Sequence, residues 1–500
     1  MTGWRGSRDG HGGGDAVGSV TELATGRAPD VERDARDGAP RAPGAGRALL
    51  ALLVLLTGLT LLVGYANKAR CVGPEFDAQG RSTPDFILRG NRDVCYSDIQ
   101  KLWLGRDIDR HVFPYLTGSI TPDGELHGGT VEYPVLSGLL MWIAAVPSHT
   151  DGEFLAWSAL LMAPFGLATG WLLGRLARWR ALLWALGPPL VLYAFHNWDL
   201  PVVACAVGAI YVVHVWGTSR PLADRAVVAA VLLGLGFAFK LYPGAFVLPL
   251  ALLVLGAPGR GEPLDWRGAL RVPFAAALTV LAVNLPFAVA GYEGWRASFT
   301  FQELRKVDIT TNSIWYWGFR PYSETTNAAF QTAVDRLSPT LVLLSFVAAC
   351  AVGWWRWRRE GVFPWIGVSA AMLCGFLLLH KVHSPQYTLW LLPFFVLLRV
   401  RWGWIVAYLV ADLAMYIGIF RLFYLLNAGA DAGIFAGLTA QAVTVGVWGR
   451  AALLVGLFVV FLRAPQTLVV DRLVTDRVGT DRPSSTDRPS TDQLSPAPTG

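Results

Sequence analysis

The first segment that could do chemistry is a long polar stretch, from Asn67 to about Glu132, that contains Cys95-Tyr96-Ser97-Asp98-Ile99. A carboxylate with an ordinary pKa near 4 is ionised at neutral pH and can take the proton of a hydroxyl group in a transfer reaction. Asp98 is therefore a candidate general base, and Tyr96 beside it a candidate substrate-binding residue. The alternative is that Asp98 is a solvated loop acid or the N-cap of a helix running through Lys101.

Five later clusters bring together polar and aromatic side chains: Glu132-Tyr133-Pro134, His196-Asn197-Trp198-Asp199, Lys240-Leu241-Tyr242-Pro243, Asn312 to Trp317, and His380 to Tyr387. Cations in these clusters suit a phosphate, and the aromatic and amide groups suit a sugar. The candidate substrate-binding residues are Glu132, Tyr133, His196, Asp199, Lys240, Asn312, Trp315, Lys381, His383, Gln386 and Tyr387.

Each candidate also has a structural interpretation. Asp199 could cap a helix, Lys240 could extend its ammonium group to the membrane surface, and Trp315 could belong to an interfacial aromatic belt. Glu132 could be only a charge at a helix start, and the histidines could be interfacial hydrogen-bonding groups.

The elements that must position these residues are membrane spans. Of the 500 residues, 53% are hydrophobic and only 16% are charged, which excludes a soluble protein with polar helix faces. Apolar windows long enough to cross a bilayer recur about twelve times between residues 48 and 462. We expect an all-α polytopic membrane domain over 48–462, with disordered cytoplasmic tails at 1–47 and 463–500.

The distribution of arginine predicts the orientation. Five short loops together hold thirteen Arg and only four acids: 175–180, 217–225, 258–271, 356–361 and 399–402. An excess of positive charge is typical of cytoplasmic loops, so we place these five loops in the cytoplasm. Both termini are then cytoplasmic, and two long loops, 67–152 and 291–338, lie outside the plasma membrane. All six polar clusters reach this outer face.

This orientation requires that Val135 to Pro147 does not cross the membrane. Thirteen residues are too few to span the hydrocarbon comfortably, so we interpret the segment as an interfacial or re-entrant helix. If it did cross, every later loop would change sides.

Two of the five cysteines, Cys71 and Cys95, share the first long outer loop. The oxidising conditions outside the cell permit a disulfide between them, which would fix the segment before Asp98, but the spacing leaves free thiols equally open. No zinc-binding cysteine spacing, phosphate-binding glycine loop or dinucleotide fingerprint occurs in the sequence. We predict no metal, no cofactor and no nucleic-acid partner.

The order of the motifs resembles the GT-C superfamily of membrane glycosyltransferases and, more narrowly, glycosyltransferase family 87 of actinobacteria. The resemblance covers about 48–462 and is carried by Tyr96-Ser97-Asp98-Ile99, Glu132-Tyr133-Pro134-Val135, His196-Asn197-Trp198-Asp199, Lys240-Leu241-Tyr242-Pro243, Asn312-Ser313-Ile314-Trp315 and Ser384-Pro385-Gln386-Tyr387.

This resemblance implies inverting transfer of a hexosyl unit, with mannose favoured, from a polyprenyl-phosphate sugar. The acceptor would be a hydroxyl of an envelope lipid or glycan, and Asp98 would be the base. No second acid adjoins Asp98, although some relatives carry an acid pair in this loop.

Two other classes of protein remain as alternatives. A transporter or flippase of lipid-linked saccharides would depend on charge inside the spans, where Asp412 is the acid in the middle of an apolar segment. A non-catalytic scaffold for envelope assembly would depend specifically on neither Asp98 nor Asp412.

Overall fold

The computed structural model describes residues 43–323, 327–431, 433 and 437–468, and this part of the chain is almost entirely helical. Seven of the described helices are long and apolar enough to cross a membrane: α1 (Pro43–Ala69), α5 (Asp151–Ala177), α9 (Leu222–Phe239), α11 (Trp266–Ala290), α15 (Ala328–Glu360), α18 (Trp402–Asn427) and α19 (Leu438–Arg463). Large apolar side chains of α11 point outward, among them Phe274 and Val289, which are 69% and 77% exposed. Such a surface suits hydrocarbon. The protein is an all-α polytopic membrane protein, as the composition predicts.

Shorter helices complete the bundle: α6 (Leu182–Ala185), α7 (Pro188–Tyr193), α8 (Leu200–His214), α10 (Val247–Leu255), α16 (Trp365–Leu379) and α17 (Thr388–Leu397). Every residue of α17 is buried, and this helix packs against α5, α6, α7, α8 and α16. Among the described residues, four apolar helical segments add to the seven long helices but are individually short, so the count of about twelve spans stays a prediction.

Long helices pack along these shorter helices and along one another. Helix α18 packs along α19, α9 lies between α8 and α11, and α16 contacts both α15 and α19. Short helical turns break the chain between spans: η2 (Arg178–Ala181), η3 (Tyr242–Phe246), η4 (Ile309–Thr311) and η5 (Pro385–Tyr387). Proline supplies the restricted backbone in η3 and η5, where Pro243 and Pro385 occupy early positions of each turn.

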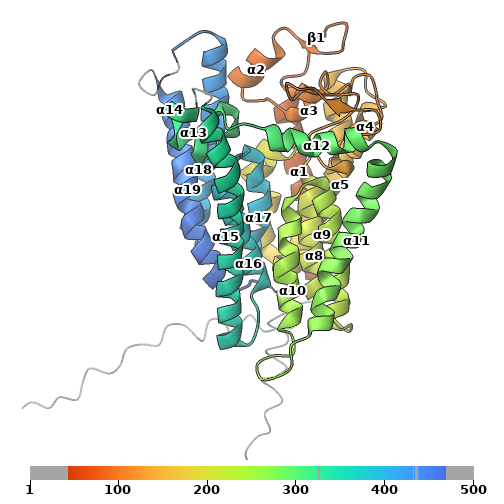
Figure 1. Cartoon of the computed structure of the whole chain (residues 1–500), viewed down its shortest axis with the longest axis vertical. Helices are drawn as coiled ribbons and strands as arrows, with labels where there is room; N and C mark the ends of the chain where they lie inside the picture. The colour runs from red at the N-terminus through yellow and green to blue at the C-terminus, as the bar shows by residue number, and fades with distance from the viewer. Residues whose placement is uncertain (1–42, 324–326, 432, 434–436, 469–500) are drawn as a thin grey trace, which may run out of the picture. The chain divides into compact units, whose positions relative to one another are not determined.

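The polar loops gather at one end of the bundle, opposite the connection between α10 and α11 (Figure 1). They form α2 (Phe86–Arg92), α3 (Asp98–Leu102), α4 (Val135–Ala145), α12 (Tyr292–Leu304), α13 (Ile314–Gly318) and α14 (Arg320–Ser323). Two antiparallel two-residue hairpins complete this end, β1 (Glu75–Phe76) with β2 (Ser82–Thr83) and β3 (Ser119–Ile120) with β4 (Leu126–His127).

Helix α4 is the segment on which the predicted orientation depends. Its eleven residues rise about 16 Å, roughly half of the 30 Å hydrocarbon thickness, so α4 does not span a bilayer by itself. It packs against α5, α9 and α11 on one side and leaves Ile143 half exposed on the other. This length agrees with an interfacial or re-entrant helix.

The expected terminal tails lie largely outside the described residues. Within the described part, α1 begins at Pro43 and α19 ends at Arg463. The chain then continues to Leu468 along the end of α17, where Leu398 and Gln466 form an isolated antiparallel bridge and the Thr467 N–H donates to the Leu397 carbonyl.

Candidate active site

Asp98 is the first residue of α3, but its carboxylate does not cap the helix. Ser97 takes that role, because its hydroxyl accepts the Ile99 N–H at 3.2 Å. The Asp98 backbone N–H donates to the His196 carbonyl at 2.9 Å, which ties the start of α3 to the turn between α7 and α8. The side chain is 27% exposed, so it is neither fully solvated nor sealed.

Two neutral donors hold the Asp98 carboxylate. The Tyr96 hydroxyl donates to Oδ1 at 3.0 Å, and the Asn197 amide donates to Oδ2 at 2.8 Å. The His196 Nε2 lies 4.0 Å from Oδ2. No Arg or Lys of the described chain forms an ion pair with this carboxylate, so lone pairs remain for an incoming hydroxyl group.

Asn197 connects Asp98 to the rest of the polar cluster. Its Nδ2 also donates to the Tyr133 hydroxyl at 2.7 Å, while its Oδ1 accepts from Lys240 Nζ at 3.0 Å and from the Trp198 N–H at 2.7 Å. An ammonium group only donates and a carboxylate only accepts, so these partners fix the orientation of the amide.

Asp199 and Lys240 form a buried ion pair behind Asn197, with Nζ 2.7 Å from Oδ1. Asp199 stands at the N-cap of α8, yet its side chain caps no helix N–H, because Oδ1 accepts from Lys240 and from Trp390 Nε1 at 2.7 Å. The other oxygen, Oδ2, is buried and has no hydrogen-bond partner within the described part of the chain. The helix-cap interpretation of Asp199 is therefore wrong.

An aromatic stack forms one wall of this cluster. The Trp390 ring lies between Tyr387, at 3.8 Å between centroids, and Tyr242, at 4.3 Å, in nearly parallel planes. Lys240 Nζ sits 5.4 Å from the Tyr133 ring centroid and 5.7 Å from that of Trp390. The two tyrosines cover both faces of Trp390, so Trp390 and Tyr242 are buried and Tyr387 is the partly exposed ring of the stack.

The local electrostatics favour an ionised Asp98. Burial raises the pKa of the Asp98 carboxyl, but the neighbouring His196, the Asn197 amide and Lys101 more than offset this effect and hold the pKa below its ordinary value. Burial, together with the nearby Lys68, lowers the pKa of His196 to about 3. At neutral pH the site therefore contains a carboxylate beside a neutral imidazole.

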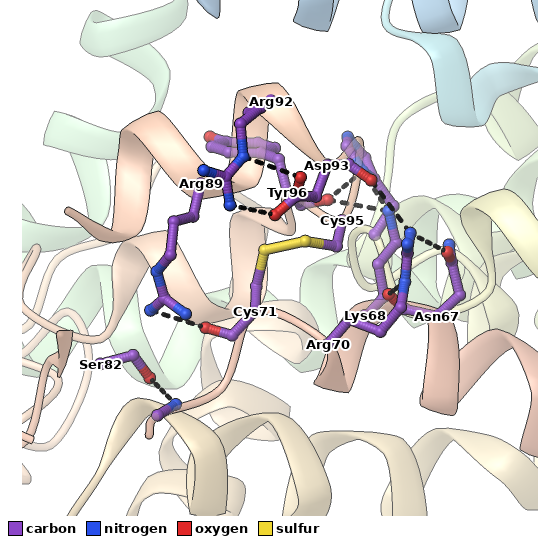
Figure 2. The surroundings of a disulfide bond; sticks show 12 residues. Asn67, Lys68, Arg70, Cys71, Ser82, Arg89, Arg92, Asp93, Cys95 and Tyr96 are labelled. Carbon is purple, nitrogen blue, oxygen red and sulfur yellow. Dashed lines mark hydrogen bonds and ion pairs between the residues drawn. A yellow bond between two sulfur atoms is a disulfide. The ribbon is translucent and has the colours of Figure 1, made fainter. Parts of the chain in front are cut away.

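A disulfide joins Cys71, just after α1, to Cys95, just before Tyr96, with their Cα atoms 5.9 Å apart (Figure 2). This is the pairing that the sequence left open. Arg70 strengthens the same junction by donating to the Asp93 carbonyl at 3.0 Å. The segment that carries Asp98 is thus tied to the end of α1.

The structure does not bring every candidate to Asp98. Glu132 pairs with Arg106 at 3.1 Å, and Lys381 pairs with Asp335 at 2.7 Å. Trp315 donates to the Leu379 carbonyl at 2.8 Å. These three residues lie at the same end of the bundle but have partners outside the Asp98 cluster.

Asn312 and His383 line a separate cavity of about 10 Å³ with Arg450. His383 Nδ1 faces the Leu377 carbonyl at 2.8 Å, and the buried Oε1 of Gln386 has no partner within the described residues. The described chain contains no group of three or more His, Cys, Asp or Glu side chains placed to hold a metal ion.

Asn197, Trp390 and Lys68 were not among the candidates from the sequence, although the structure places them in or beside the Asp98 cluster. Asn197 was named only as part of the cluster from His196 to Asp199, and its amide bridges Asp98 and Lys240. Trp390 lies in the buried helix α17. The signal for Lys68 was its type, because lysine is rare in this chain and this one ends the first span.

Comparison with known proteins identifies the family of the chain. The profile of glycosyltransferase family 87 matches residues 132–380, about half of the chain. A curated relative, GPI mannosyltransferase 1 of Saccharomyces cerevisiae, is 24% identical over 289 residues, which cover 55% of this chain and 68% of the relative. Asp98 precedes the matched residues of the family profile. The chain belongs to glycosyltransferase family 87 and is a membrane glycosyltransferase.

Proposed function

We propose that the protein transfers a hexosyl unit, mannose, from a polyprenyl-phosphate sugar to a hydroxyl of an envelope lipid or glycan. The observation that carries the proposal is the partly exposed Asp98 carboxylate, held by Tyr96 and Asn197 beside an aromatic wall. The similarity to a mannosyltransferase supports mannose as the sugar. The excess of arginine in the opposite loops supports a site on the outer face of the plasma membrane, with both termini cytoplasmic.

In this reaction the acceptor oxygen attacks C1 of the sugar as the bond between C1 and the phosphate oxygen breaks. The polyprenyl phosphate leaves with the bonding electrons, and Asp98 takes the proton of the acceptor hydroxyl. Attack from the side opposite the phosphate inverts the configuration at C1. General-base assistance of this kind contributes about 10² to 10⁴ in rate.

The departing phosphate needs a cation. Lys240 is already paired with Asp199, and Lys381 with Asp335. Arg305, which follows α12, forms no ion pair with any described residue, and its charge acts on both Tyr387 and His380. We assign phosphate stabilisation to Arg305 and sugar contacts to Tyr133, Asn197 and Tyr387.

The test is transfer from radiolabelled polyprenyl-phosphate mannose in membranes that contain the protein. Asp98→Asn should fold and insert, because asparagine keeps the shape and can still accept from Tyr96, but transfer should fall by about 10² to 10⁴. Asp123→Asn is the matched control, an exposed acid of the same polar region, and should transfer normally. Normal transfer by Asp98→Asn would refute the assignment of the base, and transfer from GDP-mannose alone would refute the donor.

A further inference from the structure

Three distant segments of the chain meet at a small cavity. Asn312 follows the turn η4, His383 lies between α16 and η5, and Arg450 lies in α19. All three side chains are buried, and all three line the cavity of about 10 Å³. Ser313 and six apolar side chains complete the lining: Ile314, Leu377, Leu378, Val447, Ala451 and Leu454.

Each of the three large polar side chains has one buried atom without a hydrogen-bond partner within the described part of the chain: Oδ1 of Asn312, Nε2 of His383 and Nε of Arg450. An unpaired buried polar atom bears the full cost of its removal from water, so such atoms are uncommon in folded proteins. Three of them from residues of one lining, which is otherwise mostly apolar, indicate a small polar ligand in the cavity.

The other contacts of these side chains decide which atoms donate and which accept. Nδ2 of Asn312 donates to the Thr310 carbonyl at 3.3 Å, so the remaining atom, Oδ1, is an acceptor. Nδ1 of His383 lies 2.8 Å from the Leu377 carbonyl, which can only accept, so Nδ1 carries a proton and Nε2 of a neutral ring is an acceptor. Nε of Arg450 can only donate.

The ring of His383 is neutral at pH 7, because burial and the charge of Arg450 lower its pKa well below the ordinary value. The cavity therefore presents two acceptors and one donor. A water molecule matches this set, since it donates two hydrogen bonds and can accept as well. An anion has no hydrogen to donate to Asn312 and His383, and the guanidinium group repels a cation. The volume of about 10 Å³ suits one water and excludes a sugar or phosphate group.

We propose that this cavity binds one ordered water molecule, which donates to Asn312 Oδ1 and His383 Nε2 and accepts from Arg450 Nε. The water joins the loop before α13 to the loop before η5, which are also tied directly by the His383 N–H bond to the Thr311 carbonyl at 2.7 Å. Arg450 Nη1 lies 3.3 Å from Asp412 Oδ1, so the water extends the buried polar network of Asp412 to the outer loops. Asn312 and His383 then hold an internal water, and this site is independent of the proposed sugar transfer.

High-resolution cryo-electron microscopy of the full chain in lipid nanodiscs tests the site in the unaltered protein. We expect one ordered water about 3 Å from each of the three atoms. If ordered water is resolved elsewhere in the protein while the cavity shows none, the proposal is overturned. Direct pairing of the Asn312, His383 and Arg450 atoms with one another, or an ion in the cavity, would also overturn it.

A pair of isosteric substitutions tests the need for a polar ligand. Ala451 lines the cavity, so both Ala451→Val and Ala451→Thr should displace the water. The threonine hydroxyl can replace some of its hydrogen bonds, whereas valine leaves all three atoms unpaired. Ala452→Val and Ala452→Thr, at the exposed neighbouring position, control for helix propensity and shape.

In thermal unfolding of the full chain in detergent, we expect Ala451→Thr to unfold about 2 to 4 °C above Ala451→Val. Ala452→Thr should show no such advantage over Ala452→Val. If threonine is no better than valine at position 451, the cavity needs no polar ligand and the proposal is overturned. If the Ala451 variants do not fold, the map of the unaltered protein decides.

Discussion

Asp98 and Asp412 are both acids set among apolar helices, but their surroundings differ. Asp412 is 2% exposed in the middle of α18, where the Tyr193 hydroxyl donates to one oxygen at 2.6 Å and Arg450 Nη1 lies 3.3 Å from the other. Asp98 lies at the end of the bundle with its side chain 27% exposed, and neutral groups hold it. Asp412 is therefore enclosed and paired with a cation, whereas Asp98 is partly exposed and has no paired cation.

This difference separates a packing role from a chemical one. A carboxylate paired with arginine inside a bundle has no free approach for a substrate, and its charge is already matched. The Asp98 carboxylate, held by an amide and a phenol, has no paired cation and is partly exposed. The comparison favours glycosyl transfer at Asp98 over the alternative of a flippase that depends on Asp412.

The largest effect in this comparison, after loss of Asp98 itself, should come from Asn197→Leu. Leucine is similar in size but removes the hydrogen bond to Asp98 and leaves Lys240 with one partner fewer. We expect transfer from polyprenyl-phosphate mannose to fall about 100-fold, because misplacement of a catalytic group by about 1 Å costs this much. Asn427→Leu, at the exposed end of α18, is the control and should transfer normally. Full activity of Asn197→Leu would mean that Asp98 needs no such support.

The pH dependence of kcat/KM tests whether an acid in the surroundings of Asp98 is the base. The pKa of Asp98 is held below its ordinary value of 3.8, so the base is ionised from about pH 5 upward and is lost only as the pH falls through that pKa. His196, with a pKa of about 3, adds no transition near neutrality. We expect a flat profile from about pH 5 to 7, measured with the protein reconstituted in lipid. An acidic transition near pH 6 to 7 would contradict an Asp98 base of this kind.

Arg450→Met should change activity least among these variants, because its main consequence is a loss of stability. Loss of the guanidinium leaves the Asp412 carboxylate buried without its cation. Removal of one partner of a buried ion pair lowers the free energy of unfolding by roughly 3 to 5 kcal/mol. Thermal unfolding in detergent should show a clear loss, and Asp412→Leu in the same chain should restore part of it. Activity per folded molecule should stay within about two-fold of the wild type. A stable but inactive Arg450→Met protein would place chemistry at the closed acid.

The sequence predicted the class of fold because membrane spans depend on local composition. The long apolar segments and the polar region between α1 and α5 follow from length and hydrophobicity alone. The short inner helices are harder to predict, because α17 is sealed by neighbours on all sides and needs no membrane-spanning length. That is why the predicted count of spans and the number of long helices differ.

The residues of the candidate site were identified in part, for a similar reason. Asp98, Tyr96, Tyr133, Asp199 and Lys240 were chosen from residue type, and the structure brings them into one network. Lys381 was chosen on the same grounds but pairs with Asp335, a residue 46 positions away that no local pattern connects to it. The contacts of Asn197 with Asp98 and Lys240 join distant segments, which residue type and spacing do not reveal.

The most direct test of the central claim measures sugar transfer by Asp98→Asn and Asp412→Asn side by side. Both substitutions keep the shape of the side chain and remove one negative charge. The same membranes, polyprenyl-phosphate mannose donor and amount of folded protein should be used for each. We predict that Asp98→Asn loses at least about 100-fold in transfer while Asp412→Asn stays within a few-fold of the wild type. The reverse result, with Asp98→Asn active and Asp412→Asn inactive, would contradict the account.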